Sequence, residues 1–183
     1  KLKENIKLMN PGVIYADPID HFVPALNHIA DLHDGVVLAG GNSGVLPEGA
    51  VHFAETQTET DEAAVLAALA QVTPDTIAKF LFTSGSTGVP KAVINTQRML
   101  CSNQQAKAQA WPFLQEQKPV LIDWLPWSHT FGSNHNFNMV LSWGGTLYLD
   151  EGKPVPGLLA KTVKNLREIS PTMYFSVPRA YDM

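Results

Sequence analysis

One short stretch restricts this chain more than any other. The apolar run Phe80-Leu81-Phe82 is followed at once by Thr83-Ser84-Gly85-Ser86-Thr87-Gly88-Val89-Pro90-Lys91. The apolar run predicts a strand, and the hydroxyl and glycine residues after it offer almost nothing that could pack in a core. Glycines let backbone N–H groups turn towards an anion, hydroxyls add donors, and a lysine adds positive charge. The stretch therefore predicts a strand followed by a loop that binds phosphate groups.

This loop does not match the common phosphate or nucleophile motifs. A Walker A loop needs lysine directly after its last glycine, but here Val89 and Pro90 separate Gly88 from Lys91. The loop also lacks the third glycine of G-x-G-x-x-G and does not contain G-x-S-x-G. The alternative is a solvated Ser/Gly connector. Pro90 argues against a connector, because it keeps the preceding residue extended and orients the lysine.

The net charge and the cysteine content limit which partners and which cellular compartment we expect for this chain. The net charge is −4 and the pI is about 5.8, so we expect no nucleic-acid partner. Cys101 is the only cysteine, which favours a reducing compartment and a cytoplasmic location. No apolar run approaches the ~18 residues of a membrane span. The sequence starts without methionine or a signal region and stops abruptly, so we expect a segment of a longer protein.

Short apolar runs alternate with amphipathic stretches along the chain. We expect helices over residues 20–32, 61–72, 97–110, 134–143 and 158–169. We expect strands over residues 36–39, 77–82, 92–95, 120–125, 146–149 and 173–177. Alternation of this kind predicts a layered α/β/α fold with a largely parallel sheet.

The stretch from Thr83 to Lys91 resembles the phosphate-binding signature of adenylate-forming enzymes, the superfamily of acyl-CoA synthetases, firefly luciferase and peptide-synthetase adenylation domains. One departure is Ala92, where the family usually has glycine. A second segment, Leu125-Pro126-Trp127-Ser128-His129-Thr130-Phe131-Gly132, is similar to the family segment that lines the acyl pocket. A histidine taken alone is more simply explained as a cap or a packed core residue, but this position favours a site for His129.

The resemblance implies that residues 1–183 are a partial AMP-binding domain, part of the large N-terminal domain of an adenylate-forming enzyme. It implies one catalytic residue, His129, and no metal ligand in this segment. The phosphate-binding residues that it implies are Thr83, Ser84, Gly85, Ser86, Thr87, Gly88 and Lys91. It also implies ATP, Mg²⁺ bound by a ligand outside this segment, and coenzyme A as co-substrate.

Three further phrases are similar to the feruloyl-CoA synthase group: residues 95–101, 123–127 and 166–172. They imply ferulate or a related aryl-propenoic acid as the carboxylate substrate. The alternative is a non-catalytic nucleotide-binding or assembly module with the same fold. We expect the isolated segment to form no adenylate, because the family's later motifs are not in it. We also expect self-association through exposed apolar surface.

Overall fold

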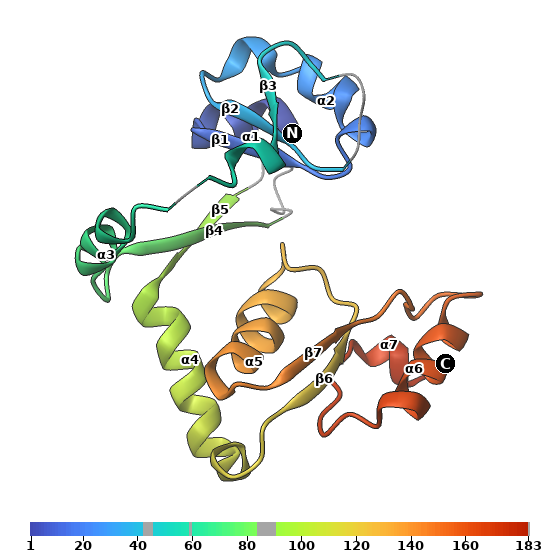
Figure 1. Ribbon diagram of the computed structural model, residues 1–183. Coiled ribbons are helices and arrows are strands. Elements are labelled where there is room, and N and C mark those ends of the chain that lie inside the picture. Colours follow the sequence, from blue (N-terminus) through green and yellow to red (C-terminus); the bar gives the residue numbers. More distant parts are fainter. Residues whose placement is uncertain (42–45, 59, 84–90, 183) are drawn as a thin grey trace. The chain divides into compact units, whose positions relative to one another are not determined.

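The computed structural model describes residues 1–41, 46–58, 60–83 and 91–182 (Figure 1). The described residues form two compact units, the first ending at Gln71 and the second beginning at Val72. Both units combine parallel strands with helices, which confirms the predicted α/β class. Among the described residues, no helix is long and apolar enough to cross a membrane.

The first unit is built on a three-stranded parallel sheet in the order β1-β2-β3. Its strands are β1 (Val13–Ala16), β2 (Val36–Ala39) and β3 (Ala50–His52), and its helices include α1 (Leu2–Met9) and α2 (Val23–Asn27). The core of this unit consists of Ala16, Ile19, Leu26, Ile29 and Ala39. The β2 strand has the predicted bounds.

The predicted helix over residues 20–32 is wrong. The chain instead forms η1 (Ile19–His21), the short α2, and η2 (Ala30–Leu32). Pro24 explains the break, because it has no N–H to bond to the carbonyl of Asp20. A proline is tolerated only in the first turn of a helix, and α2 accordingly begins next to it.

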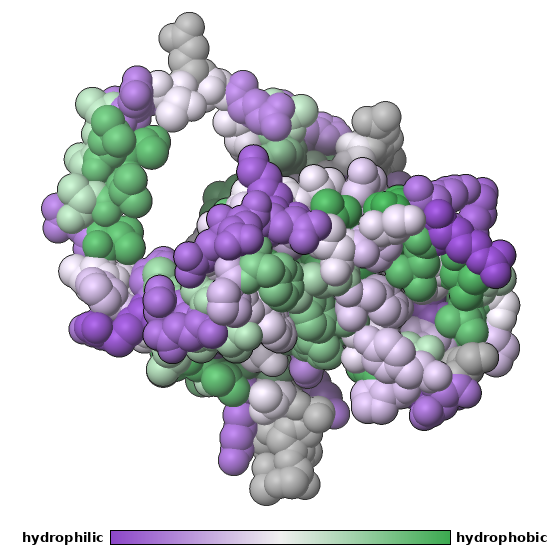
Figure 2. All heavy atoms as spheres, turned by 90° about the horizontal axis from the view of Figure 1, so that it is seen from below, coloured by the Kyte–Doolittle hydropathy of each residue, from purple (hydrophilic) through white to green (hydrophobic). Residues whose placement is uncertain are grey.

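Helix α3 (Glu62–Ala70) confirms the helix predicted over residues 61–72 but is not packed. The Asp61 carboxylate caps it by accepting the N–H of Ala64 at 3.1 Å. Its large apolar side chains are exposed: Leu66 is 55% and Leu69 is 63% exposed. In Figure 2 the left edge of the molecule, where α3 lies in Figure 1, is largely hydrophobic.

The second unit contains two pairs of strands of opposite kind. Strands β4 (Ile77–Thr83) and β5 (Lys91–Thr96) form an antiparallel hairpin, whereas β6 (Val120–Asp123) and β7 (Thr146–Leu149) are parallel. The hairpin departs from the parallel arrangement because only the short stretch of residues 84–90 joins its strands, and parallel pairing needs a crossover of about a dozen residues.

Helices complete this unit. They are α4 (Gln97–Ala110), η4 (Pro112–Gln115), the π-helix η5 (Phe131–Phe137), α5 (Asn138–Trp143), α6 (Leu159–Ile169) and α7 (Pro178–Tyr181). Its core gathers Leu114, Leu121, Met139 and Val140. The α4 helix has the predicted bounds, since Thr96 caps its start and Pro112 prevents its continuation. Cys101 lies on this helix and is exposed.

The strand predicted over residues 173–177 is also wrong. Within the described part of this segment, Met173 makes one isolated parallel bridge with Leu121. The hydroxyl of Thr172 accepts the N–H of Val120 at 2.9 Å, and the N–H of Thr172 donates to the Val120 carbonyl at 3.0 Å. A side chain therefore takes the place of a backbone partner, and the ladder does not extend.

Candidate functional site

The β4–β5 hairpin carries the predicted phosphate loop. Thr83 and Lys91 are directly paired across the two strands, so both described ends of the loop lie at the same end of the hairpin. Directly opposed residues of an antiparallel pair point to the same face, with Cβ atoms about 5 Å apart. Both residues are exposed. The side chains of Thr83 and Lys91 therefore leave the hairpin on the same face, and their hydroxyl and ammonium groups are a combination that suits a phosphate oxygen.

The other predicted phosphate-binding residues, Ser84, Gly85, Ser86, Thr87 and Gly88, lie outside the described residues. Ala92, the departure from the family pattern, pairs with Phe82 within the hairpin. Its methyl group therefore occupies an ordinary strand position.

The segment after β6 folds into a tight turn that carries His129. The N–H of Leu125 donates to Oδ1 of Asp123 at 3.0 Å, and the N–H of His129 donates to the Pro126 carbonyl at 3.0 Å. The helix that follows comes very close to this turn. A Cβ added at Gly132 would lie 2.6 Å from the Pro126 carbonyl oxygen, so only glycine fits at this position.

The backbone sets the hydrogen-bonding role of His129. The N–H of Phe131 donates to its Nδ1 at 3.2 Å. A backbone N–H can only donate, so Nδ1 is the acceptor, and in the neutral ring Nε2 carries the hydrogen. The side chain is exposed. His129 can therefore donate a hydrogen bond from Nε2 to a carboxylate oxygen.

Asp123 is a candidate that the sequence patterns did not single out. It lies at the carboxyl end of β6, which is where open α/β sheets bind ligands. The residue is 3% exposed, and its Oδ2 has no hydrogen-bond partner. Burial raises the pKa of Asp123, while the Leu125 N–H and the nearby Asn136 amide act in the opposite direction. Its position directly before a turn was the available signal.

The helix predicted from about residue 134 begins earlier, as the π-helix η5. π-Helical turns are rare in proteins, and those that occur are often found at functional sites. Two side chains of α4 bind carbonyl groups of η5: Gln104 donates to Asn134 at 3.0 Å and Lys107 donates to His135 at 2.7 Å. Burial lowers the pKa of Lys107 to about 8.

His135 is an aromatic packing residue in this unit. Its ring meets Phe175, Phe131 and Trp111 edge-on, with ring centroids 4.7, 5.3 and 5.9 Å apart. Burial lowers the pKa of His135. Among the described residues, no group of three or more histidine, cysteine, aspartate or glutamate side chains could hold a metal ion.

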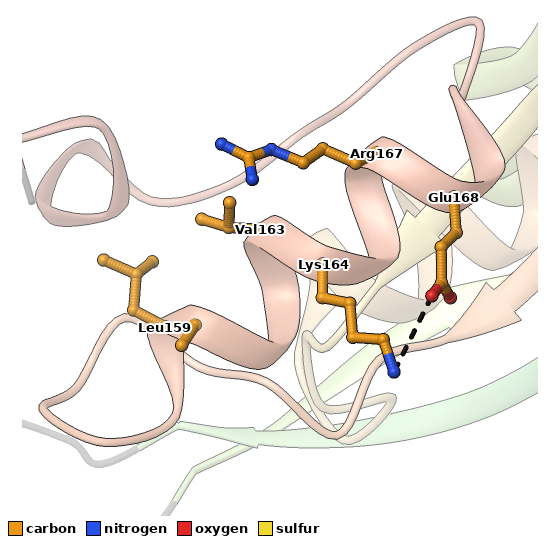
Figure 3. Close-up of a pocket in the computed structure, with 6 residues that line it drawn as sticks. Leu159, Val163, Lys164, Arg167 and Glu168 are labelled. Carbon is orange, nitrogen blue, oxygen red and sulfur yellow. Dashed lines mark ion pairs between the residues drawn. The ribbon is translucent and has the colours of Figure 1, made fainter.

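A surface hollow of about 660 Å³ lies along the outer side of α6. Figure 3 shows that Leu159, Val163 and Arg167 project into it, and that Lys164 pairs with Glu168 at 3.7 Å. One helix alone lines this hollow, and neither Lys91 nor His129 belongs to it. It encloses no volume that could exclude water from a ligand, so we assign it no function.

Comparison with known proteins defines the class. The model of a family described as AMP-binding enzyme matches residues 22–183. The chain therefore belongs to the AMP-binding enzyme family. Long-chain-fatty-acid–CoA ligase ACSBG1 of Homo sapiens is 29% identical over 132 residues, which cover 71% of this chain and 18% of that protein. Long-chain-fatty-acid–CoA ligase heimdall of Drosophila melanogaster is 29% identical over 118 residues, covering 64% and 17%.

The chain thus spans about a fifth of the length of the curated relatives that it matches. Solved structures share its fold. A luciferase-like enzyme from the mealworm Zophobas morio has a TM-score of 0.71 at 17% identity, covering 98% of this chain and 39% of that one. ATP-bound MatB from Rhodopseudomonas palustris has a TM-score of 0.64 at 23% identity, covering 99% and 32%.

Proposed function

We propose that this chain is part of the N-terminal domain of an ATP-dependent acyl-CoA synthetase. Residues 1–183 would supply the phosphate loop and part of the acyl pocket. The observation that carries this proposal is the pairing of Thr83 with Lys91 at the two ends of the loop. The names of the curated relatives, which are CoA ligases, support the same class.

The reaction requires two anions to meet. A carboxylate oxygen attacks the α-phosphorus of ATP, the bond from this phosphorus to the bridging oxygen breaks, and pyrophosphate leaves with the electron pair. Coenzyme A then attacks the acyl carbonyl through its thiolate, and AMP leaves. In the first step Lys91 would neutralise charge on the leaving pyrophosphate, and Thr83 would donate its hydroxyl hydrogen to a phosphate oxygen.

His129 would bind the other reactant. Its Nε2–H can donate to one carboxylate oxygen and leave the second oxygen free to attack. The Phe131 N–H keeps this hydrogen on Nε2, and the tight turn at Gly132 keeps the ring in place. ATP carries Mg²⁺, which prefers carboxylate ligands. We propose that the carboxylate that binds this Mg²⁺ lies outside residues 1–183.

For the acid we propose ferulate or a related aryl-propenoic acid. The three phrases over residues 95–101, 123–127 and 166–172 support this choice. In the complete enzyme that carries this segment, ferulate should then support ATP–pyrophosphate exchange with a higher kcat/KM than a long-chain fatty acid. A preference for the fatty acid would contradict the substrate proposal and leave the reaction class standing.

We propose that the isolated 183-residue chain is inactive. Incubated with ATP, ferulate and hydroxylamine, it should yield no hydroxamate, whereas the complete enzyme should yield it. Hydroxamate from the isolated chain would contradict this point. If the complete enzyme formed no hydroxamate with any acid yet bound ATP, the chain would instead belong to a non-catalytic nucleotide-binding module.

A further inference from the structure

A pair of polar residues faces inward from the β4–β5 hairpin. Lys79 and Asn95 are cross-strand partners. Lys79 Nζ donates to Ser133 Oγ at 2.9 Å, and Asn134 Nδ2 donates to Asn95 Oδ1 at 2.8 Å. Two opposed residues of the hairpin thus bind two adjacent residues of η5. We call these four residues the polar junction.

The polar junction is a closed network. Ser133 Oγ also donates to Asn134 Oδ1 at 3.2 Å, so its two halves are linked. Asn95 and Ser133 are buried, and burial lowers the pKa of Lys79. Burying such groups costs free energy that apolar side chains would not cost. A partly buried network of linked hydrogen bonds favours one arrangement of the elements that it joins.

The junction lies at the same sequence distance from each part of the candidate site. Lys79 is four residues before Thr83, and Asn95 is four residues after Lys91. Four residues of a strand span about 13 Å. Because the strands are regularly paired over these residues, the position of the junction determines the position of the loop ends. Ser133 is four residues after His129, and its N–H donates to the His129 carbonyl at 3.0 Å.

We propose that Lys79, Asn95, Ser133 and Asn134 position the two ends of the phosphate loop, Thr83 and Lys91, relative to His129, so that bound ATP and the carboxylate meet in line. The proposal rests on the proposed function. None of the four need touch a substrate: they are positioning residues that act through the hairpin and the π-helix. Without the junction, Thr83 and Lys91 would keep their contacts with ATP, and His129 would keep its contact with the carboxylate. Only the orientation of the two substrates relative to each other would change.

The test is Lys79→Met in the complete enzyme, assayed by ATP–pyrophosphate exchange. We expect kcat to fall by roughly 10- to 100-fold, because a small misplacement of reacting groups has an effect of that size. The KM values for ATP and for the acid should change less than about threefold. Lys79→Arg should restore much of kcat, because a guanidinium can also donate to Ser133. Lys118→Met removes an exposed lysine elsewhere in the unit and serves as the matched control.

A double-mutant cycle separates positioning from loss of folding. Lys79→Met and Ser133→Ala remove the same bond, so their effects on kcat should be clearly less than additive. Active sites counted by the adenylate burst should remain near wild type. An unchanged kcat in Lys79→Met, or a loss explained by fewer active sites, would overturn the positioning role alone. A wild-type enzyme that forms no adenylate would overturn the proposed function and this inference together.

Discussion

Thr83 and Lys91 stand opposite each other at the last pair of the β4–β5 ladder. The loop predicted to bind phosphate therefore starts and ends at one point of a regular hairpin. The hydroxyl and the ammonium group at this point come from two strands whose positions are tied together by backbone hydrogen bonds. This pairing fixes the backbone position of Lys91, whereas its side chain is exposed.

Replacing Lys91 should weaken the stabilisation of negative charge on the leaving pyrophosphate. In the complete enzyme, Lys91→Ala should lower kcat/KM for ATP by roughly 10- to 1000-fold, because a charged donor to the developing phosphate charge is lost. Lys91→Arg should lose less, since it keeps the charge. ATP–pyrophosphate exchange measures the effect. An unchanged exchange rate in Lys91→Ala would remove this residue from the site.

Replacing His129 should affect the acid more than the nucleotide. His129→Leu removes the Nε2 donor at similar size, so we expect KM for the acid to rise about tenfold or more, as when one charge-assisted hydrogen bond is lost. KM for ATP should stay within about threefold. His129→Gln, which keeps an N–H donor, is the matched variant. Equal effects on both substrates would speak for a structural role.

Gly132→Ala should destabilise the second unit. The new Cβ would lie 2.6 Å from the Pro126 carbonyl oxygen and 2.8 Å from that of Leu125, and both are backbone atoms that cannot turn away. We expect a loss of about 1–3 kcal/mol in the free energy of unfolding, measured by urea denaturation. At Gly12 nothing lies within 4 Å of an added Cβ. Gly12→Ala should therefore be close to neutral.

The stability of the chain should rise between pH 8 and 10.5 because of Lys107. Burial lowers its pKa from 10.5 to about 8 in the folded state. Between these values the unfolded chain binds more protons than the folded chain, so the free energy of unfolding increases with pH, by at most about 1.4 kcal/mol per pH unit. Below pH 8 both states are protonated and the full cost of burying the charge is present.

Urea denaturation across this pH range checks the Lys107 prediction. Lys107→Met should show a smaller rise, because the group that titrates has been removed. An identical rise in both proteins would assign it to other groups.

The exposed apolar side chains of α3 predict self-association of this chain. We expect sedimentation to show concentration-dependent oligomers, and Leu69→Gln to reduce them, because Leu69 is 63% exposed on a helix that is apolar on nearly all sides. Leu141 is equally exposed, at 65%, on α5. Leu141→Gln is therefore the matched control. A wild-type chain that stays monomeric would contradict the prediction.

Much of the local structure could be predicted because its signals lie within a few residues of the elements concerned. Thr96 and Pro112 mark both ends of α4, and the apolar run before Thr83 predicts β4. Residues 20–32 also contain a local signal against a single helix, because Pro24 has no N–H to donate. The result is three short helical pieces where one helix was predicted.

Some properties of the candidate site could likewise be predicted from the sequence, and others could not. Its residue types, the glycine-rich loop and the place of His129 between Pro126 and Gly132 could all be recognised from the order of amino acids. The pairing of Thr83 with Lys91, the unpartnered oxygen of Asp123 and the exposure of α3 could not. These properties depend on which strands pair and on which surfaces meet.

The polar junction shows the physical reason most directly. Lys79 and Ser133 are 54 residues apart in the chain and are joined by a hydrogen bond of 2.9 Å. In the sequence, Lys79 is a polar interruption in an apolar strand, and its neighbours carry no information about its partner. Local propensities and caps are encoded by residues close in sequence. Pairing between distant segments is decided by burial and hydrogen bonding once the chain is folded.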